Sequence, residues 1–389
     1  WPSIFLNVIF FILNQIVLFA MCLKLSNRAD FSLAVCAMYG FCSMCISMAV
    51  FVRFYMLTAL LMTLFTYLHV CYYYVDGDKA TTHVRRLILM ILGFFMLYLA
   101  HKNAQYTVIY GGIYVITFAI ILLVKKGVKR FLYYSLPMFG GGMVYLYTKT
   151  NYLQVIFDFG GIYGNGGTAL DSTLEDMVGF KLSYLPERLL DMANIFGRYI
   201  FGTFIGMVVF IVVVLVACVV RKIRRECCDD GNDFSPMVIV SSVASLAYIA
   251  IFTAFGLYEQ VRYISFVFPE LVIIVMMIAY NTFETDKYRY ALILTMLAAV
   301  ILSVNIKGKV DMLYTGDKEN IERIRNAEAD SYLMLTGNHI TFITYETAFV
   351  AQDNAEFYAY NDLEDITMEK LKSNLRDRMT VVGYRGVPM

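Results

Sequence analysis

Ten stretches of mostly apolar residues, separated by polar or charged segments, dominate the first 306 residues. They are 4–23, 31–51, 54–74, 87–100, 107–124, 131–147, 199–219, 236–256, 263–280 and 290–306. A helix of about 20 apolar residues spans the hydrocarbon core of a bilayer. The 87–100 stretch is short, so its helix is expected to begin earlier, to tilt or to thin the bilayer locally. We therefore predict a polytopic α-helical membrane protein with about ten spans.

The composition agrees with this prediction. The chain is 59% hydrophobic and 16% charged, and its mean hydropathy is +0.63. Soluble domains are nearer half apolar and a quarter charged, so an ordinary soluble enzyme and a disordered chain are excluded. The net charge of +1 gives no electrostatic reason to expect a nucleic-acid partner.

The basic residues predict the orientation of the spans. If the spans alternate, fifteen basic residues lie on one side and seven on the other. The larger set lies in segments 24–28, 75–86, 125–130, 221–225 and 287–289. Cytoplasmic loops carry the excess of Lys and Arg, so this side is predicted to be cytoplasmic. The 148–198 loop and everything after residue 306 then lie outside a plasma (inner) membrane. If one short span were two half-helices, every later segment would be inverted.

The 148–198 loop is long and carries helix signals of its own. Ser172 and Glu175 have capping-box spacing, which predicts a short helix through about Phe180. Pro186 suits the first turn of a second, amphipathic helix, and such helices tend to lie in the membrane interface. Two interpretations stay open, a structured connector and a gate over a site.

The composition changes abruptly at Lys307, and residues 307–389 contain ten basic and fourteen acidic residues. Strand-like runs at 331–336, 356–360 and 379–384 alternate with helical segments at 339–350 and 367–377. This order is typical of a small α/β domain with a mainly parallel sheet. The chain is thus predicted to have two parts, a transmembrane domain at 1–306 and a soluble extracytoplasmic α/β domain at 307–389.

Charged residues near the outer ends of spans are functional candidates, because charge at that depth is costly. Arg53 lies in the turn before the third span, and Tyr55 follows it. Arg53 would either reach the lipid headgroups or bind a phosphate, whose oxygens match a guanidinium. Glu259, Arg262 and Tyr263 enter the ninth span from outside. Glu259 and Arg262 would either pair on a helix face, or Glu259 would hold Arg262 on an anionic headgroup.

Glu270 and His101 complete the set of candidates. Pro269 is expected to kink its span, and Glu270 follows about two turns below Arg262. An unpaired carboxylate there would be costly, so Glu270 is expected to pair with a buried basic group or to line a wet cavity. His101 lies in an outer turn and is either structural or a headgroup contact. Together the candidates predict one extracytoplasmic site for an anionic, lipid-linked ligand held by Arg53 and Arg262.

Three segments together resemble the GT-C superfamily of membrane glycosyltransferases, especially its family 39 protein-mannosyltransferase-like and aminoarabinose-transferase-like members. VRFYMLTALLMTLF resembles their E-x-R-x-Y turn, LYLAHKNAQY their T-H-Y segment, and EQVRYISFVFPELVII their late RY-x-x-P-x-x-P span. Phe51 stands where the turn often has Glu, and Ala100 where Thr is usual. The resemblance covers roughly residues 1–305.

The resemblance implies transfer of a sugar from a polyprenyl-phosphate donor to an extracytoplasmic glycan, lipid or protein. It implies that Arg53 and Arg262 bind the donor phosphate, and that Tyr55, His101, Glu259, Tyr263 and Glu270 line the donor site or channel. The family's catalytic acidic residue lies in the first outer loop, after the first span. We expect that loop and span upstream of Trp1, so the chain by itself is expected to be inactive. The sequence has no metal-ligand spacing, and the resemblance leaves a divalent metal open.

Three other functions remain alternatives. A polysaccharide polymerase or ligase usually has an outer loop rich in Arg and His, whereas 148–198 has Arg188 and Arg198 and no His. A transporter of lipid-linked glycans usually shows internal repeats or paired broken helices. The sequence shows only the expected kink at Pro269 and a Gly run at 140–142. A non-catalytic membrane scaffold is the third alternative, because no acidic first loop is present in the chain.

Overall fold

The computed structural model describes most of the first 307 residues and three short segments of the remainder. The described ranges are 2–50, 55–77, 79–104, 106–148, 185–225, 235–254, 263–283, 285–307, 331–335, 356–360 and 379–383. The chain divides into two compact units, Trp1–Asp311 and Met312–Met389. Each unit is described by itself below.

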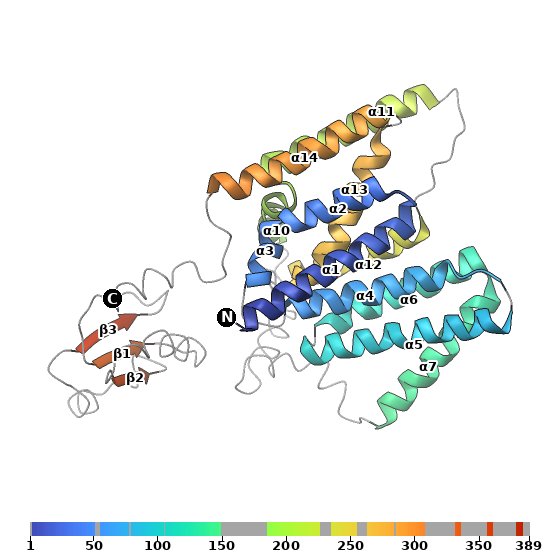
Figure 1. The fold of residues 1–389 in the computed structure, drawn as a ribbon, viewed down its shortest axis with the longest axis horizontal. Coiled ribbons are helices and arrows are strands. Elements are labelled where there is room, and N and C mark those ends of the chain that lie inside the picture. The colour runs from blue at the N-terminus through green and yellow to red at the C-terminus, as the bar shows by residue number, and fades with distance from the viewer. Residues whose placement is uncertain are drawn as a thin grey trace. The chain divides into compact units, whose positions relative to one another are not determined.

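The described part of the first unit is made of α-helices (Figure 1). They are α1 (Pro2–Ser26), α2 (Ala29–Phe41), α3 (Ser43–Val50), α4 (Tyr55–Tyr73), α5 (Ala80–Asn103), α6 (Thr107–Lys126), α7 (Val128–Thr148), α10 (Leu185–Ile200), α11 (Phe204–Arg225), α12 (Pro236–Ala254), α13 (Phe268–Thr282) and α14 (Asp286–Lys307), with a 3-10 helix, η5 (Ser265–Val267), leading into α13. Among the described residues, six helices are long and apolar enough to cross a membrane, and a bent pair raises this number to seven. By length and composition, the unit is a multi-pass helical membrane protein.

Six of the ten predicted spans coincide with these apolar helices. They are 4–23, 54–74, 87–100, 107–124, 236–256 and 263–280. The short 87–100 stretch belongs to α5, which begins at Ala80. Of the three explanations offered for its length, the structure therefore supports the first, because the helix starts well before its most apolar part.

The other four predicted stretches are helical, but the described residues do not make each of them one spanning helix. The 31–51 stretch is interrupted at Cys42, whose ψ of 120° takes the chain out of the helix between α2 and α3. The 131–147 and 290–306 stretches form α7 and α14, which are not among the six candidate spans found within the described residues. The 199–219 stretch falls on α10 and α11, whose axes meet at 89°. A count of ten spans is therefore not established by the described helices.

The second helix predicted in the 148–198 loop is present as α10, with Pro186 in its first turn. Its Leu189 and Leu190 are exposed. If α11 crosses the membrane, a helix at 89° to it runs close to the membrane plane, where exposed leucines can enter the interface. The helix predicted to begin at Ser172 lies outside the described residues.

The centre of the first unit is formed by α4, α12 and α13. In their apolar windows, 67% of the residues of α4, 56% of α12 and 78% of the η5–α13 span are buried, against 22% in α1 and α5. The outer surface of α5 instead exposes a row of large apolar side chains, Leu87, Ile88, Ile91, Leu92 and Phe95. A row of this kind is suited to contact with lipid. The bundle therefore has a buried central group of helices and a lipid-facing periphery.

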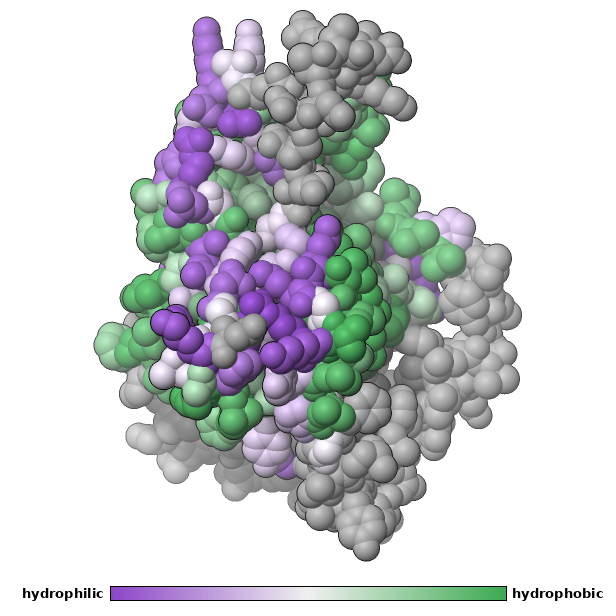
Figure 2. All heavy atoms as spheres, turned by 90° about the vertical axis from the view of Figure 1, so that its right-hand side faces the viewer, coloured by the Kyte–Doolittle hydropathy of each residue, from purple (hydrophilic) through white to green (hydrophobic). Residues whose placement is uncertain are grey.

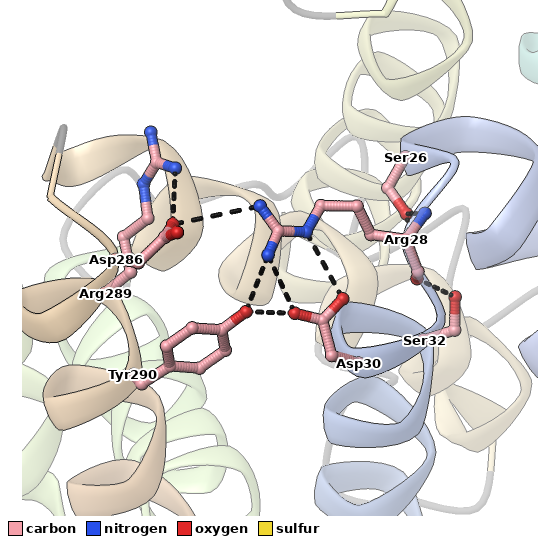
Figure 3. A network of polar contacts seen from close by, with 7 residues as sticks. All are labelled: Ser26, Arg28, Asp30, Ser32, Asp286, Arg289 and Tyr290. Atoms are coloured by element: carbon pink, nitrogen blue, oxygen red, sulfur yellow. Dashed lines mark hydrogen bonds and ion pairs between the residues drawn. The ribbon is translucent and has the colours of Figure 1, made fainter.

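An ionic network holds the α1–α2 turn against the start of α14 (Figure 3). Arg28 donates two hydrogen bonds to Asp30, at 2.9 and 3.2 Å, and one to the Tyr290 hydroxyl at 2.8 Å. Tyr290 in turn donates to Asp30. Asp286 pairs with Arg289 at 3.1 Å and lies 3.8 Å from Arg28. These two turns are among the segments that the sequence assigns to the cytoplasmic side.

A second ionic cluster joins two further turns of the predicted cytoplasmic side. Asp76, between α4 and α5, pairs with Lys126 at 3.1 Å and with Arg130 at 3.0 Å. Lys24 lies 5.7 Å from the centre of the Tyr74 ring, which links the end of α1 to the end of α4. Figure 2 looks from the right-hand side of Figure 1 and shows hydrophilic residues gathered at the centre, with apolar residues beside them.

We expect the Arg28 network to contribute to stability in a pH-dependent way. Hydrogen bonds from Arg28 and Tyr290 hold the pKa of the Asp30 carboxyl well below its usual range. Because the pKa of Asp30 is depressed in the folded protein, its contribution to stability is complete above the ordinary, unfolded-state pKa of about 3.9. The contribution is lost as the pH falls from there through the lower pKa of the folded state. The pair is exposed, so solvent screens it and its contribution at neutral pH is small.

Unfolding of the solubilised protein, followed by circular dichroism from neutral pH to about pH 3, tests this expectation. Asp30→Asn should flatten the loss of stability below about pH 4. Glu187→Gln changes an exposed carboxylate on α10 and should keep the wild-type slope. An Asp30→Asn slope equal to that of the wild type would show that the network adds nothing.

The described part of the second unit is a three-stranded parallel sheet. Its strands are β1 (Ser331–Leu335), β2 (Glu356–Tyr360) and β3 (Met379–Gly383), in the order β2-β1-β3. Ser331 is in register with Glu356 on one side and with Met379 on the other. The strands lie where the sequence predicts them and pair in parallel. The helices predicted at 339–350 and 367–377 lie outside the described residues.

Candidate functional site

Four of the seven predicted site residues fall on the part of the chain that the structure describes. These are Tyr55, His101, Tyr263 and Glu270. The other three, Arg53, Glu259 and Arg262, lie outside the described residues.

Tyr55 and His101 lie at the same end of the bundle, opposite the ionic network around Arg28. Tyr55 begins α4, and His101 lies in the last turn of α5. Asn103, two residues after His101, donates a hydrogen bond of 2.5 Å to the hydroxyl of Thr58. This bond fixes the end of α5 to the first turn of α4.

Tyr263 joins the same end through packing. Its ring centre lies 5.1 Å from that of Tyr106, which precedes α6, and the two rings meet edge to face. The hydroxyl of Tyr248, on α12, donates to the Tyr263 carbonyl at 2.8 Å. Tyr263 and His101 are only 7% and 6% exposed. Both side chains are thus part of the packing at this end rather than open to a ligand.

Glu270 does not lie on a kinked helix, so this part of the prediction is wrong. The chain forms η5 and then begins α13 at Phe268, which puts Pro269 in the first turn. Proline is well tolerated there, because a first-turn N–H has no partner within the helix. Pro269 therefore starts a helix instead of bending one, and Glu270 follows in the same turn.

Glu270 lies further into the bundle, away from the outer end where the other described candidates lie. Its Oε1 accepts a hydrogen bond of 2.6 Å from the hydroxyl of Thr66. Thr66 is eleven residues beyond Tyr55 on α4, which corresponds to about 16 Å along the helix axis. Within the described residues no basic side chain forms an ion pair with Glu270, so the predicted pairing with a buried base is not found there. The candidate residues consequently occupy two levels, an outer end and a polar centre.

His69, one turn beyond Thr66 on α4, is not among the predicted site residues. Its Nδ1 lies 2.8 Å from the Phe65 carbonyl, and its Nε2 lies 2.9 Å from the Tyr134 hydroxyl. A carbonyl only accepts, so Nδ1 carries the proton and Nε2 accepts from Tyr134. The ring is held among Phe65, Tyr114 and Phe118. His69 is therefore structural. The sequence signal that could have drawn attention to it is a histidine within a run of apolar residues.

The described residues were also compared with the requirements of a metal centre. No group of three or more His, Cys, Asp or Glu side chains in this part of the chain is placed to hold a metal ion. A divalent metal therefore has no ligand set among the described residues.

Comparisons with known proteins add no relative. No protein-family model, no curated protein and no solved structure matches the chain. The function must therefore be argued from the site itself.

Proposed function

We propose that the protein is an integral-membrane glycosyltransferase that moves a sugar from a polyprenyl-phosphate donor to an extracytoplasmic acceptor. The supporting observation is that α4, the end of α5 and the segment that begins at Tyr263 pack together at one end of the bundle. Arg53 stands two residues before Tyr55, and Arg262 directly precedes Tyr263. Both arginines are therefore expected to border this end, where two guanidinium groups suit a lipid-linked phosphate.

The proposed reaction follows from these charges. A hydroxyl or amine of a glycan, lipid or protein acceptor attacks the anomeric carbon of the donor sugar. The bond from that carbon to the phosphate oxygen breaks, and polyprenyl phosphate leaves. Arg53 and Arg262 would hold the charge that develops on the leaving phosphate. The base that takes the acceptor proton would be an acidic residue, as the GT-C resemblance implies.

We also propose where the two parts of the chain lie with respect to the membrane. The apolar helices would lie in the plasma membrane, with the outer end of α4 and α5 facing away from the cytoplasm. The second unit would be an α/β domain on that outer face. Parallel strands need crossover connections of a dozen or more residues, and the intervals between its strands are long enough for helical crossovers.

A transporter of lipid-linked glycans is a second candidate, because two observations favour it. The α10–α11 pair is bent by 89°, and α13 starts inside the bundle with a buried carboxylate in its first turn. Broken helices and buried charges are features of substrate or ion pathways in transporters.

A transfer assay with the complete gene product in membranes distinguishes the two candidates. With a radiolabelled polyprenyl-phosphate sugar, we expect label to move to an acceptor. Arg262→Ala should lower the rate roughly tenfold or more, because a charge-assisted contact to the leaving phosphate is lost. Arg85→Ala removes an exposed arginine of α5 on the other side and should leave the rate unchanged.

Two results would count against the glycosyltransferase. Full activity of Arg262→Ala would remove the phosphate role of this arginine. Movement of the labelled lipid across sealed vesicles without any sugar transfer would favour the transporter.

A further inference from the structure

The buried carboxylate of Glu270 has no counter-charge in the described structure, and this observation is independent of the proposed function. Glu270 is only 3% exposed, and the Thr66 side chain that donates a hydrogen bond to its carboxylate is a neutral hydroxyl. A buried, unpaired negative charge is strongly unfavourable, so a carboxyl in such a place is neutralised by a proton or by a bound cation. Glu270 must therefore acquire one positive charge from solution.

The groups around the carboxylate are oxygen atoms from three other helices. Thr66 on α4 donates to Oε1, and its hydroxyl oxygen also lies 3.0 Å from the Thr63 carbonyl oxygen. The side chain of Ser241 on α12 lies near Glu270 and near Tyr114 of α6. Hydroxyl, carbonyl and carboxylate oxygens are the ligands that hard cations prefer.

Three further hydroxyls of this region are buried without a hydrogen bond of normal geometry. They are those of Tyr110 and Tyr114 on α6 and of Ser245 on α12, which are 1%, 0% and 0% exposed. The Tyr110 and Tyr114 rings lie 6.0 Å apart on α6, which packs against α12, and α12 packs in turn against α13. Burying a hydroxyl without a partner is costly. Their oxygens are thus available to a ligand held by Glu270.

Among the described residues, the titratable groups that interact with Glu270 are neutral at ordinary pH. They are Cys22 from α1 and Tyr110 and Tyr114 from α6. Other elements also pack on α13, namely α2, α4, α11, α12 and α14. None of their described side chains is a charged group that interacts with the Glu270 carboxylate. A single negative charge is therefore balanced by a monovalent cation, whereas a divalent ion would leave a buried positive charge.

We propose that Glu270, with the hydroxyls of Thr66, Ser241, Tyr110 and Tyr114, forms a binding site for an exchangeable monovalent cation at the centre of the bundle. Both Na⁺ and the proton are monovalent cations that would balance the charge of Glu270, and an experiment can tell them apart. The site connects α4, α6, α12 and α13, so occupancy stabilises the arrangement of the central helices. Cation binding would be measurable without knowing the substrate of the protein.

The test is the thermal unfolding midpoint of the purified complete protein in detergent. NaCl is titrated against choline chloride at constant ionic strength, at several pH values between about 5 and 8. If Na⁺ is the ligand, we expect the midpoint to rise by roughly 5 °C at saturation, with no rise in choline. If the proton is the ligand, we expect a rise of similar size as the pH is lowered, with no difference between Na⁺ and choline.

Glu270→Gln removes the charge while keeping the shape, so it should abolish either dependence. Glu187→Gln is the matched control, because Leu-Pro-Glu begins α10 as Phe-Pro-Glu begins α13, yet Glu187 is exposed. This control should keep the wild-type response. Should Glu270→Gln not fold, Tyr114→Phe removes one ligand oxygen and should raise the half-saturating Na⁺ or proton concentration several-fold.

Two outcomes overturn the proposal. One is a wild-type midpoint that changes neither with Na⁺ nor with pH over this range. The other is a response that persists unchanged in Glu270→Gln, or in Tyr114→Phe where that variant replaces it.

Discussion

Replacing Tyr248 with alanine is expected to lower the free energy of unfolding by about 2–4 kcal/mol. Tyr248 is 0% exposed, and its ring lies 4.3 Å from that of Phe252 and 5.2 Å from that of Phe266. Alanine would leave a cavity between α12, α6 and η5. Large-to-small changes of buried aromatic residues cost about 3–5 kcal/mol in soluble proteins. The value expected here is lower, because lipid already provides an apolar environment to separated helices.

The same substitution should also disturb the outer end of the bundle. Tyr248 holds the Tyr263 carbonyl through its hydroxyl at 2.8 Å. Tyr248→Phe keeps the ring and removes only this bond, so it should cost about 1 kcal/mol. Reversible unfolding in mixed micelles, followed by circular dichroism, measures both variants. An alanine variant no less stable than the phenylalanine variant would show that the ring contributes no packing energy.

Gly202→Ala is expected to have an effect of similar size, about 2–4 kcal/mol, for a different reason. Gly202 has a φ of +76°, which side-chain-bearing residues rarely adopt. A Cβ at this position would lie 2.7 Å from the carbonyl oxygen of Ala299 and 3.0 Å from the Cβ of Ser303. The carbonyl oxygen is backbone of α14 and cannot rotate away. Alanine would therefore strain the turn and push α14 from it.

This turn lies between α10 and α11, so its geometry sets the 89° bend of the pair. Ser303 donates a hydrogen bond of 2.8 Å to the Gly202 carbonyl, which fixes α14 to the turn. Gly112→Ala is the control, because nothing lies within 4 Å of a Cβ built there inside α6. That change should be neutral or stabilise by up to about 1 kcal/mol. Equal stability of the two alanine variants, measured by thermal unfolding, would contradict the steric argument.

The helical membrane class could be predicted from the sequence because it depends on local properties. An apolar run of about 20 residues has few alternatives to a spanning helix, since lipid offers no partner to its backbone groups. Six predicted spans and the α10 helix were located in this way. The strands at 331–335, 356–360 and 379–383 were found from their composition and spacing. The roles of Arg53, Glu259 and Arg262 remain predictions.

The interruptions of the helices depend on the tertiary structure. The break at Cys42 and the start of α13 at Phe268 fall inside apolar sequence that reads as continuous. A hydropathy pattern does not reveal such breaks, because apolar side chains suit a lipid environment whether the helix continues or not. Pro269 was visible as a signal, but only the packing around it distinguished a helix start from a kink.

By itself, the sequence determined the membrane class, the positions of most apolar helices and the strand positions of the tail, because each follows from a short local pattern. Only the tertiary structure decided which polar residues meet. Thr66 and Glu270 lie on helices far apart in sequence, and their hydrogen bond at the bundle centre depends on which face each helix buries. In lipid both faces of a helix are apolar, so amphipathic periodicity does not reveal that face.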